Sequence, residues 1–367
     1  MEKFIMKYTR IILFALLLYF SLSFSVYGQT DLTKYLPEGY NTTGDVDYTT
    51  YLQKGLDENK SVLMPDFPVL INKVGLNLKN NQIVSFQSNS CLIMEPNTES
   101  SYGILNIIDV DNVKVNNAYL IGDKDKHLGT NGEWGMGINI LSSSNVIINN
   151  PTIEKAWGDG IYIGEISHKE RKKYNKKKYY SSNVQIIGGK LDGNRRNGIS
   201  VISVKNLLIE NTLIQNTNGK LPMAGIDIEP NNNEQFLEDI TIRNVTTKNN
   251  EEVGVKYVPL NFVGHRKKTV RINIENHSDY GSKIGLFIGG LLYDKLKKVD
   301  NTILDGQIVI KNFKSYSNSK SVQIGSIQKF NPKIIFDNFS VFDKNIRNTE
   351  KENKIKTEVK TKKLIYK

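Results

Sequence analysis

A short pattern, Gly-Ile-x-Ile, recurs down the chain and limits its possible folds more than any other feature. The clearest copies begin at Gly137, Gly160, Gly198 and Gly225, and looser copies begin at Gly254, Gly285 and Ser321. Successive copies start 23, 38, 27, 29, 31 and 36 residues apart. Repeats of this length built from short apolar runs are typical of a solenoid, in which each copy contributes one coil.

A second pattern precedes most copies: an Asn or Asp opens an alternating apolar run. It occurs at Asn112, Asn145, Asn183, Asn206 and Asp239. Alternation with period two places the apolar residues on one side of a strand and the x residue on the other. Short strands joined by Asn- and Gly-rich turns predict an all-β, single-domain parallel β-helix. Its core is expected to contain Ile138, Ile140, Ile161, Ile163, Ile199, Val201, Ile226 and Ile228.

These two patterns resemble the right-handed parallel β-helix proteins of the pectate lyase and polygalacturonase superfamily. The resemblance covers roughly Asp45 to Asp343. It implies a right-handed coil that opens with a short capping helix. It leaves the reaction open, because the superfamily includes lyases, hydrolases, epimerases and phage tailspikes.

The N-terminus has the features of a secretory signal over residues 1–28. Lys3, Lys7 and Arg10 precede an apolar stretch from Ile11 to Phe24, and the small residue Gly28 precedes Gln29. This predicts a secreted, periplasmic or cell-surface protein with no membrane insertion once the signal is removed. An uncleaved N-terminal anchor is the alternative. Residues 29–348 are then the β-helix, and residues 349–367 a charged tail or a terminal edge strand.

A short helix is expected over about residues 45–60. Asp47 is a suitable N-cap, and Tyr48, Tyr51, Leu52 and Leu56 follow at helical spacing. Such a helix would cover the open end of the solenoid, where an exposed strand edge would otherwise pair with other chains. Strands of the first coils are expected at 61–65, 67–71, 82–86 and 91–94.

The charge balance points to a polyanionic partner. Lys and Arg number 49 against 38 Asp and Glu, a formal net charge of +11. An anionic polysaccharide fits this charge, and no nucleic-acid motif is present. An insertion at residues 165–180 carries seven Lys or Arg and three Tyr, which suits an anionic glycan or simply a solvated loop. The single cysteine, Cys91, rules out a disulfide framework and a cysteine-based metal site.

Aligning the repeats places polar residues in one outward row. The row contains Asn139, Tyr162, Ser200, Asp227, Lys256, Phe287 and Gln323. Neighbouring rungs are ~4.8 Å apart, so Asp227 is expected one rung from Ser200 and from Lys256. Glu229 is two residues further along the strand and is expected on the same face, ~6.6–7 Å from Asp227.

Turn residues before the glycines extend the candidate site. Trp134 and Trp157 occupy equivalent places one coil apart and suit a pair of sugar platforms, or an internal aromatic ladder. Arg195 and Arg196 form a candidate clamp for a carboxylate, or a solvated turn. Asp159 and Asn197 each precede a repeat glycine. The expected substrate-binding set consists of Trp134, Trp157, Asn139, Ser200, Arg195, Arg196 and Asn197.

Two reactions remain open for these residues. The carboxylates Asp227, Glu229 and Asp159 suit glycoside hydrolysis, and inverting enzymes hold their carboxyl groups ~6.5–9.5 Å apart. A lyase instead neutralises a uronate carboxylate, here with Lys256, Arg195 or Arg196. Its proton-abstracting base would be Tyr162 or Lys256.

The catalytic motifs of known subfamilies are absent from the sequence. The polygalacturonase set of Asn-x-Asp, Asp-Asp, Gly-His-Gly and Arg-x-Lys motifs is not matched, since Gly264-His265-Arg266 is not Gly-His-Gly. Residues 227–230 lack the His of the epimerase Asp-Pro-His-Glu cluster. No metal site is expected, because too few acids share a rung to support Ca²⁺. The sequence therefore predicts a secreted lyase or glycosidase acting on an anionic polysaccharide. The alternative is a non-catalytic glycan-binding or adhesive β-helix, and the oligomeric state is left open.

Overall fold

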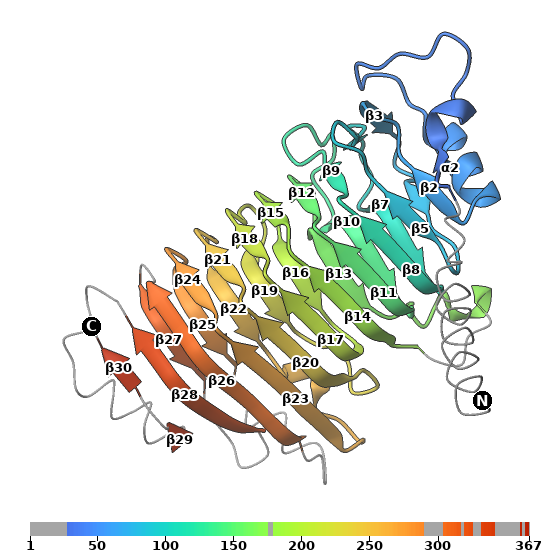
Figure 1. Cartoon of the computed structure of the whole chain (residues 1–367). Helices are drawn as coiled ribbons and strands as arrows, with labels where there is room; N and C mark the ends of the chain where they lie inside the picture. Colours follow the sequence, from blue (N-terminus) through green and yellow to red (C-terminus); the bar gives the residue numbers. More distant parts are fainter. Residues whose placement is uncertain are drawn as a thin grey trace, which may run out of the picture.

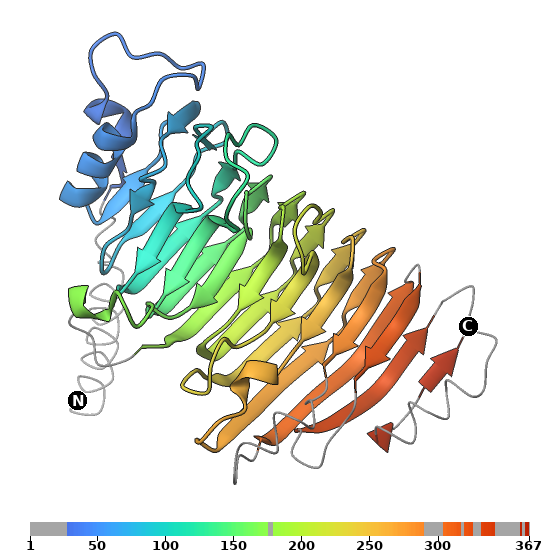
Figure 2. The ribbon, with the colours of Figure 1, turned by 180° about the vertical axis from the view of Figure 1, so that it is seen from behind.

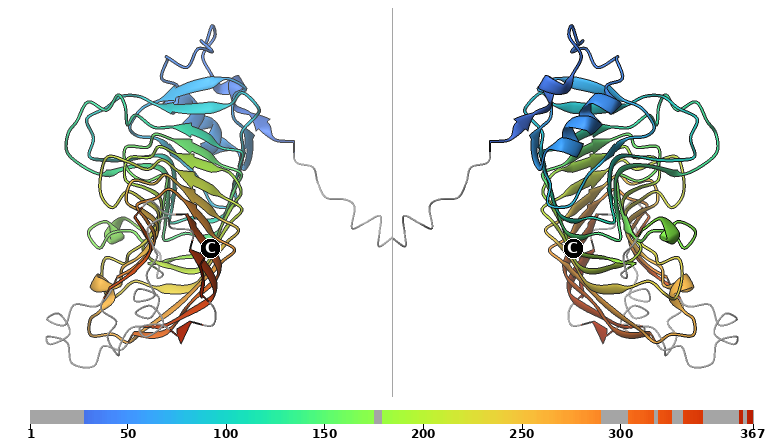
Figure 3. Two further views of the ribbon diagram at one scale, coloured as in Figure 1. Left: turned by 90° about the vertical axis from the view of Figure 1, so that its left-hand side faces the viewer. Right: turned by 90° about the vertical axis from the view of Figure 1, so that its right-hand side faces the viewer.

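The chain folds as a right-handed parallel β-helix, shown by a computed structural model (Figure 1). The structure describes residues 28–174, 179–289, 304–316, 319–325, 332–341, 360–361 and 364–366. Within these segments the strands form one 21-stranded and one 9-stranded sheet, and strands of successive coils pair in parallel. Figure 3 shows the coils stacked along one axis, with the blue N-terminal segment at one end and the red strands at the other. The predicted fold class is confirmed.

Each copy of the Gly-Ile-x-Ile pattern supplies one strand of the 9-stranded sheet. Adjacent strands in this sheet come from adjacent coils, so residues about one repeat apart in sequence become neighbours. The strands are β4 (Leu76–Asn77), β7 (Ser101–Ile108), β10 (Trp134–Leu141), β13 (Ile161–Gly164), β16 (Asn197–Val201), β19 (Ala224–Ile228), β22 (Val253–Tyr257), β25 (Ile284–Ile288) and β27 (Lys320–Ile324).

The asparagine-led runs form the long strands of the larger sheet. Their first Asn residues adopt positive φ, for example 60° at Asn112 and 56° at Asn145, a conformation that Asn tolerates better than most residues. Stacked amides also bond between coils, with Asn145 Nδ2 donating to Asn112 Oδ1 at 2.8 Å. The long strands are β8 (Asp111–Asn116), β11 (Ser144–Asn149), β14 (Ser181–Ile187), β17 (Val204–Glu210), β20 (Leu237–Arg243), β23 (Lys268–Glu275), β26 (Leu304–Tyr316) and β28 (Lys333–Val341).

Shorter strands complete the larger sheet. Those of the first coils lie where the sequence predicts them, at β2 (Ser61–Leu63), β3 (Pro68–Ile71), β5 (Ile83–Ser85) and β6 (Cys91–Met94). The others are β1 (Thr30–Asp31), β9 (Tyr119–Ile121), β12 (Thr152–Glu154), β15 (Lys190–Asp192), β18 (Leu213–Gln215), β21 (Thr246–Lys248), β24 (Ser278–Tyr280), β29 (Lys360–Thr361) and β30 (Leu364–Tyr366).

The core runs the length of the solenoid. The eight Ile and Val residues predicted to be buried all have no exposed surface, which confirms the inward and outward assignment. The repeating glycine has a steric origin. A Cβ on Gly198 would lie 2.6 Å from the carbonyl oxygen of Gly225 in the next coil, and one on Gly225 would lie 2.6 Å from that of Gly254. Successive coils therefore approach too closely here for any side chain.

The N-terminal end is covered by α2 (Thr49–Glu58) together with the short helix η1 (Leu32–Tyr35), as Figure 1 shows. The predicted capping helix is present. The helix begins at Thr49 with Tyr48, rather than the predicted Asp47, at the N-cap position, although the Asp47 carboxylate accepts the Thr49 N–H at 2.9 Å. Leu52 and Leu56 are fully buried, whereas Tyr51 is 39% exposed and lies outside the apolar stripe.

The two ends of the chain lie largely outside the described segments. This applies to residues 1–27 of the predicted signal and to most of the predicted tail, of which β29 and β30 pair with β28. No helix in the part of the chain that the structure describes is long and apolar enough to cross a membrane. The insertion predicted at 165–180 connects β13 to β14 and contains the short helix η2 (Arg171–Lys173). Figure 2 shows η2 projecting from the same edge of the solenoid as η3 (Leu260–Phe262).

Candidate functional site

The predicted outward row forms on the 9-stranded sheet. Backbone register pairs Tyr162 with Ser200, Ser200 with Asp227 and Asp227 with Lys256 in consecutive strands. The middle of the row is nevertheless covered, because Ser200 is fully buried and Asp227 is only 1% exposed. The sequence pattern correctly gives the direction of these side chains but not what lies over them.

Lys256 joins the two carboxylates on which the sequence analysis centres. Its Nζ lies 2.6 Å from Glu229 Oε2, a hydrogen bond, and 3.4 Å from Asp227 Oδ1, an ion pair without hydrogen-bond geometry. Because these two contacts share one ammonium, Asp227 Oδ1 and Glu229 Oε2 lie no more than about 6 Å apart. This bound concerns one oxygen of each group, and the expected separation of ~6.6–7 Å between the two residues stays a prediction. Both carboxylates thus contact the same ammonium, although Glu229 follows the last residue of β19.

Asp227 occupies an unusual environment for a carboxyl group. Asn197 Nδ2 donates to its Oδ2 at 3.4 Å, and its buried Oδ1 makes no hydrogen bond. Burial raises the pKa of Asp227 to about 6, the positive charge of Lys256 acts against that rise, and the negative charge of Glu229 adds to it. A carboxyl group with such a pKa can hold a proton in mildly acidic solution.

Asp159 is fully buried and saturated with partners. Ser200 Oγ donates to its Oδ2 at 2.7 Å, the Asn197 N–H donates to its Oδ1 at 3.0 Å, and Arg196 Nη1 lies 3.2 Å from Oδ2. Burial raises its pKa, against the opposing charge of Arg196. Asp159 therefore fixes Arg196 and the start of β16. The sequence analysis expected a catalytic carboxylate at Asp159, but the structure presents no free carboxylate there.

Tyr162 does not fit the role of a proton-abstracting base. Burial, followed by the nearby negative charge of Asp159, raises the pKa of its hydroxyl to about 12. A phenol with that pKa stays protonated at neutral pH. A hydrogen bond to Asn231 opposes the rise without cancelling it.

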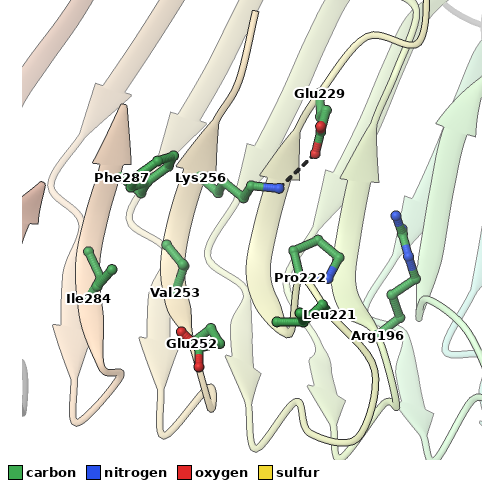
Figure 4. A pocket seen from close by; sticks show the side chains of 9 residues that line it. All are labelled: Arg196, Leu221, Pro222, Glu229, Glu252, Val253, Lys256, Ile284 and Phe287. Carbon is green, nitrogen blue, oxygen red and sulfur yellow. Dashed lines mark hydrogen bonds and ion pairs between the residues drawn. The ribbon is translucent and has the colours of Figure 1, made fainter. Parts of the chain in front are cut away.

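A pocket of about 410 Å³ opens over this row (Figure 4). Glu229 and Lys256 line it and are 29% and 15% exposed, so they form the polar wall nearest to Asp227. Its apolar wall includes Leu221 and Pro222, which lie in the loop between β18 and β19. The full lining is Arg196, Leu221, Pro222, Glu229, Glu252, Val253, Lys256, Ile284 and Phe287.

The sequence analysis missed Leu221, Pro222, Val253, Ile284 and Glu252 as site residues. A signal was available for the loop, because the chain between Gln215 and Ala224 is longer than the corresponding turn before Asn197. Such long turns project from a solenoid and can wall a pocket. No such signal marks Val253 and Ile284, which start ordinary strands.

The two tryptophans occupy different environments. Trp134 is 47% exposed and remains available as a sugar platform. Trp157 is 8% exposed, with His127 stacked at 3.9 Å and the Arg195 guanidinium 3.6 Å from its ring centre, so no free face remains. The expected pair of platforms does not form.

The remaining predicted binding residues are also engaged. Arg195 Nη1 donates to the carbonyl oxygens of Gly132 and Trp157, both at 3.1 Å, and so does not act with Arg196 as a clamp. Asn197 is fully buried, and its Oδ1 accepts the Ala224 N–H at 3.0 Å. Asn139 Nδ2 donates to Asn106 Oδ1 at 3.0 Å in the neighbouring coil. Of the predicted substrate-binding residues, only Arg196 lines the pocket. Glu229 and Lys256, which were predicted as catalytic residues, line it as well.

No group of three or more His, Cys, Asp or Glu in the described segments is arranged to hold a metal ion. The acidic residues near the pocket are instead paired with cationic side chains. Cys91 is buried, and burial raises the pKa of its thiol to about 12.

Two curated proteins of Bacillus subtilis (strain 168) are similar in sequence. Uncharacterized protein YclG is 28% identical over 268 residues, and the SPbeta prophage-derived uncharacterized protein YorA is 27% identical over 164 residues. The matches cover 69% and 42% of this chain but 44% and 28% of those proteins, so the chain spans less than half of the length of each. No family model matches the chain.

Several solved structures share the fold. A mutant tailspike protein of E. coli bacteriophage HK620 in complex with hexasaccharide gives a TM-score of 0.62 at 11% identity, over 86% of this chain and 57% of that chain. Iota-carrageenase complexed to iota-carrageenan fragments gives 0.58 at 12% identity, over 88% and 92%. The mannuronan C-5 epimerase AlgE4 A-module of Azotobacter vinelandii gives 0.55 at 11% identity, over 86% and 88%. At these identities the likeness shows the fold, and it confirms the resemblance to parallel β-helix proteins without selecting a subfamily.

Proposed function

We propose that this protein is a secreted enzyme that degrades polysaccharides, and that it acts as a glycoside hydrolase. The observation that carries the proposal is the cluster of Asp227, Lys256 and Glu229 at the wall of the pocket. It combines a carboxyl group of raised pKa with a second carboxylate that is open to the pocket.

Glycoside hydrolysis needs one carboxyl group that donates a proton and a second that acts as a nucleophile or activates water. Asp227 suits the first role, because its pKa of about 6 keeps a fraction protonated near neutrality. Glu229 suits the second, because it lines the pocket and would touch a bound sugar. Asp227 lies behind Lys256, so its proton reaches the sugar when the flexible lysine side chain moves aside.

Lyase chemistry is less well supported by the same geometry. It needs a cation that neutralises a uronate carboxylate, but Arg196 and Lys256 are both paired with protein carboxylates. It also needs a base, and the raised pKa of Tyr162 opposes that role.

Secretion and a carbohydrate substrate rest on further observations. The predicted signal at residues 1–28 supports export. Two structures of the same fold are complexes of those proteins with carrageenan fragments and with a hexasaccharide. The net charge of +11 favours a polymer that is anionic as a whole.

The test is to incubate the protein from Gln29 onward with a panel of uronate, sulfated and mixed polysaccharides. Hydrolysis releases new reducing ends without the ultraviolet absorbance of an unsaturated sugar. Appearance of that absorbance would identify a lyase instead. Binding without any new ends would favour the non-catalytic, adhesive alternative. The Glu229→Gln variant is the control, since it keeps the shape of the pocket wall.

A further inference from the structure

We propose that the sugar residue seated in the pocket carries no carboxylate or sulfate, even if the polymer as a whole is anionic. This inference rests on the proposed function and adds the class of sugar at its site. It predicts a heteropolysaccharide substrate in which uncharged or amino sugars occur among acidic ones.

The first support is that both cations lining the pocket are already paired with protein carboxylates. Arg196 Nη1 lies 3.2 Å from Asp159 Oδ2, and its Nε lies 3.5 Å from Glu133 Oε2. Lys256 contacts Glu229 at 2.6 Å and Asp227 at 3.4 Å. An acidic sugar would have to displace one of these partners to gain a counterion.

The second support is the local excess of acidic groups. Glu252, at the pocket rim, pairs with Lys283 at 2.7 Å. Five carboxyl groups thus lie at or next to the pocket, against three cations, Arg196, Lys256 and Lys283. The carboxyl groups are those of Glu133, Asp159, Asp227, Glu229 and Glu252. Like charges in contact at a protein surface repel each other. A sugar carboxylate in contact with Glu229 or Glu252 would incur a cost of this kind, whereas a neutral ring would not.

The third support is the apolar wall. Phe287, Pro222, Ile284 and Leu221 line the side of the pocket away from Glu229 (Figure 4). Aromatic and aliphatic surfaces pack against the C–H face of a sugar ring without contacting a charged substituent. The pocket therefore offers carboxylates for hydroxyl groups and apolar contact for the ring. A net charge of +11 over the whole chain shows that the acidic excess is local.

Binding measurements on the Asp227→Asn variant test the inference directly, because this variant lacks the proposed acid and keeps the pair of Lys256 with Glu229. The probes are oligosaccharides of N-acetylhexosamine, of hexosamine and of uronic acid, with affinity measured by calorimetry at low and high salt. We expect binding of at least one of the first two, weakened about ten-fold when Phe287→Ala removes the ring contact. Tight binding of uronic acid oligosaccharides that is lost with Phe287→Ala would overturn the inference.

A second variant tests the reason given for it. Glu133→Gln removes a partner of Arg196 while keeping the side-chain shape. Uronic acid oligosaccharides should then bind several-fold more tightly, with affinity for uncharged oligosaccharides unchanged. An equal change for both classes would contradict the role of charge.

Cleavage products separate this inference from the proposed function. Among polymers that are cut, every new pair of chain ends should include an uncharged or amino sugar, and homopolymers of uronic acid should stay intact. Cleavage of such a homopolymer would contradict the inference about the sugar but would still support the proposed hydrolase function. If no polymer is cleaved, the proposed hydrolase function is contradicted. The binding measurements would still decide which sugar the pocket binds.

Discussion

Lys256 is the residue that sets the protonation of the proposed acid. Burial alone would raise the pKa of Asp227 further than about 6, and the ammonium 3.4 Å away limits that rise. If Asp227 donates the proton, activity should fall as pH increases through about 6. Because the folded-state pKa lies above the unfolded value of 3.8, the stability that this group contributes is also greatest at low pH. That contribution is lost as pH rises from about 4 to about 6.

Replacing Lys256→Met should move this pH profile. Without the ammonium the pKa of Asp227 rises, so the descending limb of kcat/KM should shift to higher pH by at least about one unit. Lys283→Met is the matched control, because Lys283 pairs with Glu252 at the rim and not with Asp227. An unmoved limb in Lys256→Met would show that Asp227 is not the titrating acid.

The sequence predicts some of the individual site residues and not others. Asp227, Glu229 and Lys256 follow from period-two alternation and from register between coils, which the repeat pattern specifies. The burial of Asp159 and Trp157 and the partial burial of Tyr162 do not follow, since they depend on side chains that fold over the sheet from neighbouring coils. Arg195 and His127 bury Trp157, for instance, although the Trp position itself is equivalent to that of Trp134.

The strands of the 9-stranded sheet depend on close contact between coils at the repeat glycine. Gly198→Ala would place a Cβ 2.6 Å from the Gly225 carbonyl oxygen and 2.1 Å from the Ile214 side chain. Neither contact can be accommodated without moving backbone. Overpacking of this kind costs roughly 1–3 kcal/mol.

Chemical denaturation of Gly198→Ala should therefore show a loss of stability in that range. Lys114→Ala, at an exposed outward position of β8, is the control and should change stability by less than about 0.5 kcal/mol. Equal stability of Gly198→Ala and the native protein would remove the steric explanation of the repeat.

Elements were predictable where the repeat is regular. Between β10 and β22, the strands of the Gly-Ile-x-Ile copies and of the Asn- or Asp-led runs were expected, because these patterns recur there. The short strands β12, β15, β18 and β21 were not. The two-residue strand β4 was not, because its Leu76–Asn77 has neither the Gly-Ile pattern nor a full alternating run. The loop carrying Leu221 and Pro222 is marked in the sequence by its length, but its position over the pocket depends on the tertiary structure.

At the scale of the whole molecule, the solenoid assembles one pocket from residues far apart in sequence. Arg196, Glu229, Lys256 and Phe287 come from successive coils and meet because each coil adds one rung to the same sheet. Fold is therefore readable from the repeat, whereas function depends on which side chains a given coil carries outward. Proteins of the same fold accordingly include a carrageenase, an epimerase and a tailspike.

The measurement that tests the account most directly compares Asp227→Asn with the native protein in kcat/KM on a cleaved polysaccharide and in stability. Loss of the acid should lower kcat/KM by at least ~10²-fold. The free energy of unfolding should change by less than about 1 kcal/mol, since Asn keeps the shape and the lost ion pair with Lys256 is offset by removal of a buried charge. An Asp227→Asn variant with native activity would contradict the proposed carboxylate mechanism.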